Sequence, residues 1–219
     1  MKIPPLTNES TLICLAQAGD LDAFNQIVLA YQDRLFNVAF YLLHCEESAA
    51  DAVQNAIIKS YRSLHSFRGG PFYPWLVRIL KNGCIDELRR RKRQPSVPLE
   101  PLTREDDPVE DATWLEDFST DPARIYESRE LSRTIFESIK RIPTEYQLPL
   151  VLVDIEGMDY AQAASVVGVQ LNTFKSRLFR ARAKVCRLLG ECPHNNVFPL
   201  SSGLRRGYAD RSANGGLAA

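Results

Sequence analysis

The chain has 219 residues, 45% of them hydrophobic and 25% charged, which is typical of a globular protein with one large or two small domains. Its 27 basic and 27 acidic residues cancel, so the total charge does not indicate a nucleic-acid partner. No run of about 18 apolar residues exists, and Met1–Ser10 lacks the apolar core of a signal peptide. The five cysteines are odd in number and show no C-x-x-C spacing, so we expect reduced thiols and a cytoplasmic location.

The charges are distributed unevenly along the chain. Residues 61–93 carry 9 basic and 2 acidic side chains, and residues 161–190 carry 6 basic and no acidic ones. Between them, residues 94–131 carry 3 basic and 11 acidic side chains. Two basic blocks separated by an acidic strip indicate two contacts with a polyanion and a different environment between them.

In the first half of the chain, three helices are expected. Apolar residues recur at three- and four-residue spacing over residues 20–43, which predicts an amphipathic helix. A second helix is expected from about Ser48, in a variant of the capping box. After the turn-rich stretch 66–73, Pro74 suits the first turn of a third helix that runs to about Arg93.

The second half begins with a stretch unlike its neighbours. Residues 94–127 hold five prolines and most of the acidic excess, which predicts a linker with little fixed structure. Helical patterning resumes over residues 128–156, and two further helices are expected near 160–167 and 172–189. We therefore predict an all-α protein with five parts: an N-terminal segment 1–19, a small helical domain 20–93, a flexible acidic linker 94–127, a second small helical domain 128–190 and a disordered tail 191–219.

Three residues of the second domain have the spacing of a helix-turn-helix. Ala164 is small where two helices would touch, Gly168 follows four residues later for the turn, and Phe174 lies six further on to pin the second helix. Asn172 or Thr173 can cap that second helix.

At 100° per residue, the second helix of this motif divides into two faces. The apolar face holds Phe174, Leu178, Ala181, Val185, Leu188 and Leu189, and the polar face holds Thr173, Ser176, Arg177, Arg180, Lys184 and Arg187, flanked by Lys175 and Arg182. Short polar groups for base edges and cations for phosphates fit a helix laid in the major groove, where Phe179 could touch a thymine methyl. The alternative is a solvated basic helix, which the upstream spacing disfavours.

The third helix of the first domain also has a basic face. Its packed side is formed by Leu76, Ile79, Leu80, Cys84 and Leu88, and the other side by Trp75, Arg78, Asn82, Arg89 and Arg93. An aromatic ring, an amide and several cations on one face suit single-stranded DNA, and the preceding Gly-Gly-Pro loop could hold an extruded base. Trp75 fits a core position equally well, and the run 89–93 also fits a solvated helix end.

These motifs resemble a known family. The segments Ala49–Gln54, Phe67–Gly69 and Trp75–Ile79, with Asn82, Asp86 and the basic run 89–93, resemble conserved region 2 of the extracytoplasmic-function (ECF) sigma factors. Ile142-Pro143, Gly157–Ala164 and Thr173–Arg182 resemble region 4 of the same family. The family usually has Glu, an aromatic residue, Arg and Gly at the positions of Ala50, Ile57, Gln147 and Asn172.

The resemblance implies a sigma subunit that binds core RNA polymerase and promoter DNA, without catalysis, a cofactor or a metal. Asp51, Gln54, Asn55 and Ile58 would dock on the clamp helices of the largest polymerase subunit. Arg68, Phe72, Tyr73, Trp75, Arg78, Asn82, Arg89 and Arg93 would bind the melted −10 element, with a flipped base held by Asn82 and the loop 66–74. Asn172, Thr173, Lys175, Ser176, Arg177, Phe179, Arg180 and Lys184 would read the −35 element as duplex.

The resemblance also implies further contacts. The region 4 scaffold would rest on the polymerase flap, and the acidic linker would thread through the nucleic-acid channels of the enzyme. Members of the family are often held by an anti-sigma protein.

Two other classes of protein are the alternatives. A helix-turn-helix regulator that binds operator DNA without polymerase would account for residues 140–190 but not for the first domain. A metal protein would need ligands, and Cys186, Cys192 and His194 are close in sequence, but their spacing fits no ordinary zinc motif.

Overall fold

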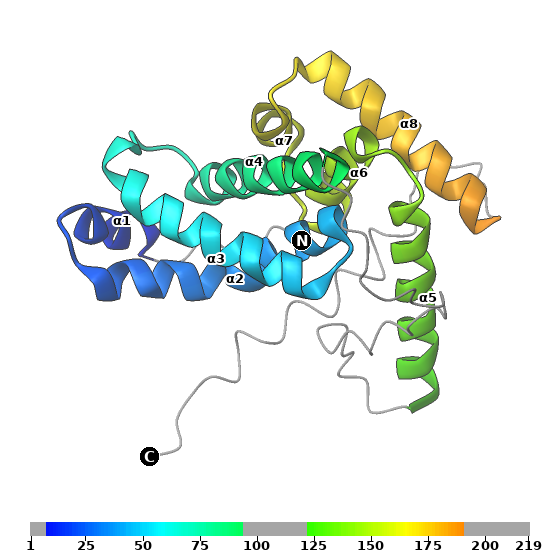
Figure 1. Ribbon diagram of the computed structural model, residues 1–219, viewed down its shortest axis with the longest axis horizontal. Coiled ribbons are helices and arrows are strands. Elements are labelled where there is room, and N and C mark those ends of the chain that lie inside the picture. The colour runs from blue at the N-terminus through cyan, green and yellow to red at the C-terminus, as the bar shows by residue number, and fades with distance from the viewer. Residues whose placement is uncertain (1–7, 94–121, 191–219) are drawn as a thin grey trace.

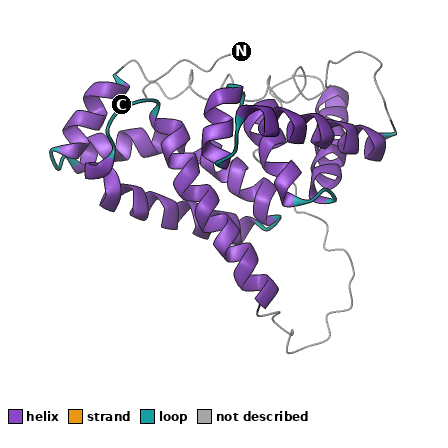
Figure 2. Ribbon diagram, turned by 90° about the horizontal axis from the view of Figure 1, so that it is seen from above, coloured by secondary structure: helices purple, strands orange, loops and turns teal. Residues whose placement is uncertain are grey.

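A computed structural model describes residues 8–93 and 122–190, with the backbone alone for 122–129 and 131. Within these ranges every regular element is a helix, which confirms the all-α prediction (Figure 2). None of the described helices is both long enough and apolar enough to cross a bilayer. Most of the predicted linker and all of the predicted tail lie outside the described residues.

Residues 8–93 form four α-helices and one short 3-10 turn. They are α1 (Glu9–Gln17), α2 (Leu21–Leu43), α3 (Glu46–Ser63), the 3-10 turn η1 (Leu64–Ser66) and α4 (Phe72–Arg93). The helix α2 begins where the Asp20 carboxylate accepts a hydrogen bond from the Ala23 amide at 3.0 Å. It ends at His44, whose backbone is left-handed with φ 55°.

Residues 122–190 form four α-helices and one π-helical turn. They are α5 (Pro122–Lys140), α6 (Thr144–Leu150), the π turn η3 (Val151–Ile155), α7 (Tyr160–Val167) and α8 (Leu171–Leu189). Pro149 lies inside α6 and has no amide hydrogen to donate to the helix ladder. The wider turn of η3 follows it, with the Glu156 amide bonded to the carbonyl of Val151 at 2.9 Å.

Several predicted boundaries need correction. The helix α1 was not predicted, although its Ile13 and Ala16 are buried. The helix α3 begins two residues before Ser48, and Ser48 bonds to Cys45 and Arg91 instead of capping it. The helix α5 begins inside the predicted linker, at a proline that needs no amide partner there.

The helix α2 is the centre of the first half, where α1, α3 and α4 pack around it. Its apolar face is buried from Ala23 to Leu43, and the Phe24 ring contacts the Tyr61 ring of α3 with centroids 5.0 Å apart. The Gln17 amide at the end of α1 donates to the carbonyls of Leu64 and Phe67, at 3.0 and 2.9 Å. These bonds tie α1 to the turn that leads into α4.

The two halves of the described chain are in contact. The helix α2 packs on α5, α6 and η3. The helix α4 packs on α7 (Figure 1). The Phe136 ring of α5 stacks on Phe40 of α2 at 4.7 Å between centroids. The buried residues therefore form one continuous core across both halves, a contact that the sequence analysis did not predict.

A polar pair lies in this contact. The Gln147 side chain, only 2% exposed, donates from Nε2 to the carbonyls of Ile139 and Ile142, and the same nitrogen lies 3.2 Å from His44 Nε2. His44 Nδ1 and Gln147 Oε1 are buried and find no hydrogen-bond partner among the described residues. Burial, followed by the charges of Lys140 and Arg91, lowers the pKa of His44 to about 4.

We predict that acid destabilises the protein through His44. The unfolded chain binds a proton near the ordinary histidine pKa of about 6.5, whereas the folded chain does so only near pH 4. The free energy of unfolding should therefore have its full value above about pH 6.5 and decrease as the pH drops toward 4. At pH 5.5 the decrease should be roughly 1 kcal/mol. The measurement is urea unfolding at pH 7.5 and 5.5.

His44→Asn is the matched control, because asparagine tolerates the left-handed backbone and does not titrate in this range. The variant should lose part of the pH dependence. An unchanged pH dependence in His44→Asn would contradict the assignment.

Candidate nucleic-acid and polymerase interfaces

The four residues expected to bind polymerase lie on one helix and reach solvent. Asp51, Gln54, Asn55 and Ile58 of α3 are all exposed, and the Ile58 side chain is 43% exposed although it is apolar. Asp51 and Asn55 also line a groove between α3 and α4, whose other wall includes Arg93. The structure thus brings this set beside the end of the basic helix.

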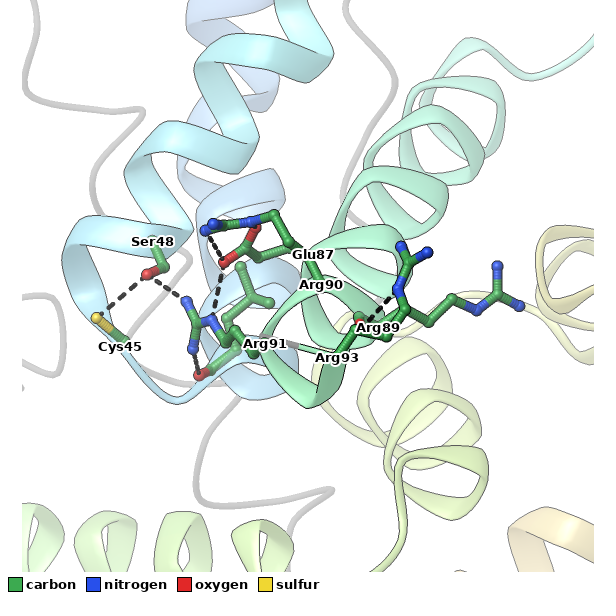
Figure 3. Close-up of polar contacts among 8 residues, drawn as sticks. Cys45, Ser48, Glu87, Arg89, Arg90, Arg91 and Arg93 are labelled. Atoms are coloured by element: carbon green, nitrogen blue, oxygen red, sulfur yellow. Dashed lines mark hydrogen bonds and ion pairs between the residues drawn. The ribbon is translucent and has the colours of Figure 1, made fainter. Parts of the chain in front are cut away.

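The basic run at the end of α4 is partly neutralised within the helix. Both oxygens of Glu87 accept from Arg90, at 2.8 and 2.9 Å, and Oε1 also accepts from Arg91 at 2.9 Å (Figure 3). These two guanidinium groups lower the pKa of Glu87 to about 2. Arg91 further bonds to Ser48 and to the Leu43 carbonyl, which makes it a structural residue. Arg89 and Arg93 remain exposed.

On the remainder of α4, three predicted residues form an accessible face. Arg78 and Asn82 are exposed one turn apart, and Trp75 is half-buried on the same side. The Trp75 ring packs against Phe67 and Phe72, at 5.3 and 5.2 Å between centroids. Trp75 is therefore packed on one side and partly accessible on the other. Arg68, in the loop before α4, is exposed.

Phe72 and Tyr73 need correction as DNA contacts in this arrangement. Phe72 is 1% exposed and packs in the aromatic cluster with Phe67 and Trp75. Tyr73 is 7% exposed, and its hydroxyl donates to Glu156 at 2.7 Å. Phe72 and Tyr73 are the first two residues of α4, where this helix meets the core. Neither ring can therefore reach DNA in this arrangement.

The helix-turn-helix prediction is confirmed in its packing. Asp159 caps α7 by accepting from the amides of Ala161 and Gln162, at 2.9 and 3.0 Å. Ala164 is buried, and Gly168 ends α7 with φ 84°, in the left-handed region that glycine adopts readily. Phe174 is completely buried and fixes α8.

The polar face of α8 reaches solvent along its length. Phe179 is 69% exposed, which confirms that it lies off the apolar arc. Of the residues expected to read duplex DNA, Asn172, Thr173, Lys175, Ser176, Phe179, Arg180 and Lys184 are exposed and Arg177 is half-buried. Neither Asn172 nor Thr173 caps the helix, because α8 begins at Leu171 and its N-cap is Gln170, two residues before Asn172. Lys184 also lies over the Tyr146 ring, 5.4 Å from its centroid.

Two buried acids were missed in the sequence analysis. The Asp154 carboxylate forms a two-pronged ion pair with Arg182 of α8, at 2.6 and 3.0 Å, so Arg182 is structural. The Glu156 carboxylate accepts from Arg34 of α2 at 2.9 Å and from Tyr73. Burial raises the pKa of Glu156, and the charge of Arg34 opposes that rise. The available signal was two acids within the apolar run 150–158, since buried carboxylates need partners.

In the described part of the chain, no three metal-ligating side chains gather. Cys192 and His194 lie outside the described residues.

Two helical units, each with a basic exposed helix face, define a DNA-binding protein that carries a helix-turn-helix. A family model described as Sigma-70 region 2 matches residues 27–94, and one described as Sigma-70, region 4 matches residues 132–185. The chain belongs to the extracytoplasmic-function sigma factors. Because region 2 accounts for the first half, the operator-binding regulator is the less supported alternative.

Curated relatives match more than four fifths of the chain. The RNA polymerase sigma-H factor of Pseudomonas aeruginosa is 34% identical over 183 residues, which are 83% of this chain and 93% of that protein. The ECF RNA polymerase sigma factor SigM of Mycobacterium tuberculosis is 34% identical over 184 residues, 84% of this chain and 85% of that protein.

Solved structures share the fold. CnrH in complex with the cytosolic domain of CnrY is 24% identical, with a TM-score of 0.59 over 83% of this chain and 97% of that one. The sigma factor RpoE in complex with the anti-sigma factor NepR from Bartonella quintana is 23% identical, with a TM-score of 0.57 over 78% of this chain and 98% of that one.

We predict opposite effects of alanine at two glycines. Gly168→Ala should destabilise the protein by about 1 kcal/mol, because its left-handed φ disfavours a side chain although the surrounding space is open. Gly83→Ala in α4, where space is also open and φ is not positive, should stabilise it by about 0.5–1 kcal/mol. Thermal unfolding of both variants measures the difference, and equal signs would contradict this account of the turn.

Proposed function

We propose that the chain acts as a sigma subunit: it binds core RNA polymerase in the cytoplasm, directs it to particular promoters and helps to open them. The observation that carries the proposal is the pair of exposed basic faces, one on α4 and one on α8, in the two units that match regions 2 and 4. The protein works by binding, without catalytic turnover. Tethering both faces to polymerase raises their effective concentration at one promoter.

The helix α8 is proposed to read the −35 element as duplex. Its buried apolar arc fixes it on α6 and α7, and its first three turns expose Lys175, Ser176 and Arg180. No acidic residue lies between 161 and 190, so DNA phosphates meet no repelling charge from this segment. Asn172 and Thr173 are exposed at the N-terminal end of α8, where a recognition helix contacts base edges.

The face of α4 is proposed to bind the melted non-template strand of the −10 element. Trp75 offers part of a ring for stacking, Asn82 an amide for a base edge, and Arg78, Arg89 and Arg93 charges for phosphates. Arg68 extends this set into the loop before α4. Captured bases offset the stacking energy that is lost on melting.

The exposed side of α3 is proposed to bind the largest polymerase subunit. Asp51, Gln54, Asn55 and Ile58 combine polar groups with an exposed apolar side chain, as interface residues often do. The region 4 scaffold would rest on the polymerase flap. The segment 94–121 would connect regions 2 and 4 as an acidic linker in the nucleic-acid channels. Since RpoE of Bartonella quintana is described in complex with an anti-sigma factor, an anti-sigma partner is also proposed here.

Run-off transcription with core polymerase tests the proposal. Transcripts from a cognate promoter should require this chain. If the chain neither binds core polymerase nor supports transcription but still binds duplex DNA, the operator-binding regulator is the better description.

Arg180→Ala should weaken promoter binding by the holoenzyme at the upstream element, by about 1–3 kcal/mol, because one exposed guanidinium on the reading face is lost. Arg133→Ala removes an exposed arginine from α5 and serves as the matched control. Footprinting and titration measure both variants. Equal losses in the two would mean that α8 does not read the DNA.

Asn82→Ala should impair promoter opening more than duplex binding, because the amide is proposed to act only on an extruded base. Permanganate reactivity of unpaired thymines measures opening, and titration on duplex promoter measures binding. Unchanged permanganate reactivity would refute the proposed base capture.

A further inference from the structure

The loop before α4 lies between two packed residues. Residues 68–71 connect Phe67 to Phe72, the first residue of α4, and all four of them are exposed. At the far end of the loop, Phe72 is buried in the core. At the near end, the Phe67 ring packs against the rings of Phe72 and Trp75, at 5.1 and 5.3 Å between centroids. The ends of this loop are therefore fixed, while its middle faces solvent.

The middle of the loop is intrinsically flexible. Gly69 and Gly70 both have a φ of 93°, in the left-handed region that glycine adopts readily, and a Cβ at either position would have open space around it. Glycine loses more conformational freedom than any other residue when its backbone is ordered. The position of this backbone therefore depends on how firmly the ends of the loop are held.

The near end is held from another helix, by Gln17 of α1. The Gln17 side chain donates from Nε2 to the carbonyl of Leu64 at 3.0 Å and to the carbonyl of Phe67 at 2.9 Å. Both carbonyls lie where α3 and η1 end, and the last carbonyls of a helix have no amide partner within it. The Leu64 carbonyl also accepts from the Phe67 amide at 3.1 Å. One glutamine thus holds the turn η1 and the last residue before the loop.

The helix α1 is a firm support for this glutamine. Its Ile13 and Ala16 side chains are buried against the core of the first half. At the start of α1, Glu9 accepts a hydrogen bond from the Tyr31 hydroxyl of α2 at 2.7 Å. The helix lies before the segment that matches Sigma-70 region 2. The near end of the loop is therefore held by a residue from outside the matched segment.

We propose that Gln17 is a positioning residue for base capture, which holds the loop before α4 in place for the extruded base of the −10 element. The inference rests on the proposed capture of a base at α4 and its preceding loop. Gln17 itself does not touch the DNA. Without its two hydrogen bonds, the glycine pair would have to be ordered when the base binds, and this entropy cost would weaken capture.

Two variants remove these hydrogen bonds by different means. Gln17→Ala deletes the amide, and Gln17→Glu keeps its shape but places acceptor oxygens against the two carbonyls. Both substitutions lie at an exposed helix position and introduce good helix formers, so the fold should persist. Gln26→Ala and Gln26→Glu make the same changes at an exposed glutamine of α2 and are the matched controls.

The probe is the non-template single strand of the −10 element of a cognate promoter, labelled with fluorescein and titrated with the holoenzyme. Strands in which one base at a time is replaced by an abasic site locate the captured base, whose loss should weaken binding to the wild-type holoenzyme about tenfold. Both Gln17 variants should bind the intact strand about fivefold more weakly, and their penalty for that one abasic site should fall to about twofold. The Gln26 variants should match wild type.

The abasic penalty separates positioning from general damage, because a merely structural loss would weaken the binding of every strand alike. The inference requires a reduced penalty in both Gln17 variants. If the penalty stays near tenfold in either of them, or falls equally in the Gln26 variants, the inference is overturned while the proposed capture by the wild-type chain stands. If the wild-type holoenzyme shows no captured base, the proposed base capture itself is wrong and the inference falls with it.

Discussion

The arrangement of the two regions depends on one buried carboxylate. Glu156 is in the core, where an ionised group without partners would be very unfavourable. Its partners come from different elements: Arg34 from α2 and Tyr73 from α4. Neither lies in the region that contains Glu156. The carboxylate therefore has these partners only while regions 2 and 4 are in contact. Its need for them constrains how the two regions meet, together with the apolar contact of Phe136 with Phe40.

The local cause of this geometry is the π turn after α6. Two acids lie close together here, Asp154 in η3 and Glu156 directly after it, and their side chains point in different directions. Asp154 reaches Arg182 of α8, inside region 4, and Glu156 reaches Arg34 across the contact. The same turn therefore holds the reading helix and the contact between regions. A change in either ion pair would alter the geometry of the other, because a backbone segment of only three residues connects them.

Periodicity and turn chemistry were sufficient to predict the helices α2, α4, α7 and α8 and the packing of the helix-turn-helix. These features are local, since they depend on spacing within one segment. The contacts of Glu156 with Tyr73 and of Gln147 with His44 could not be predicted, because in each pair the two residues lie more than 80 positions apart along the chain. The burial of Phe72 and Tyr73 has the same origin: an aromatic pair before a basic helix fits a DNA platform or a core equally well until its neighbours are known. The helix α1 is short and was missed because its burial comes from α2 and η1.

The charge of a segment measures its attraction for DNA only after internal pairs are subtracted. In α4, Glu87 is bonded to Arg90 and Arg91, so the dense run of cations offers less free charge than its sequence indicates. In α8, Arg182 is the one cation that bonds to an acid among the described residues, and that acid lies in another element. The basic block of α8 has fewer cations than that of α4, but a larger share of its charge is directed to solvent. This distribution of charge fits the duplex recognition proposed for α8, which depends on phosphates along one groove. In α4, where charge is partly neutralised, the single-strand binding proposed above would rely more on an aromatic ring and an amide.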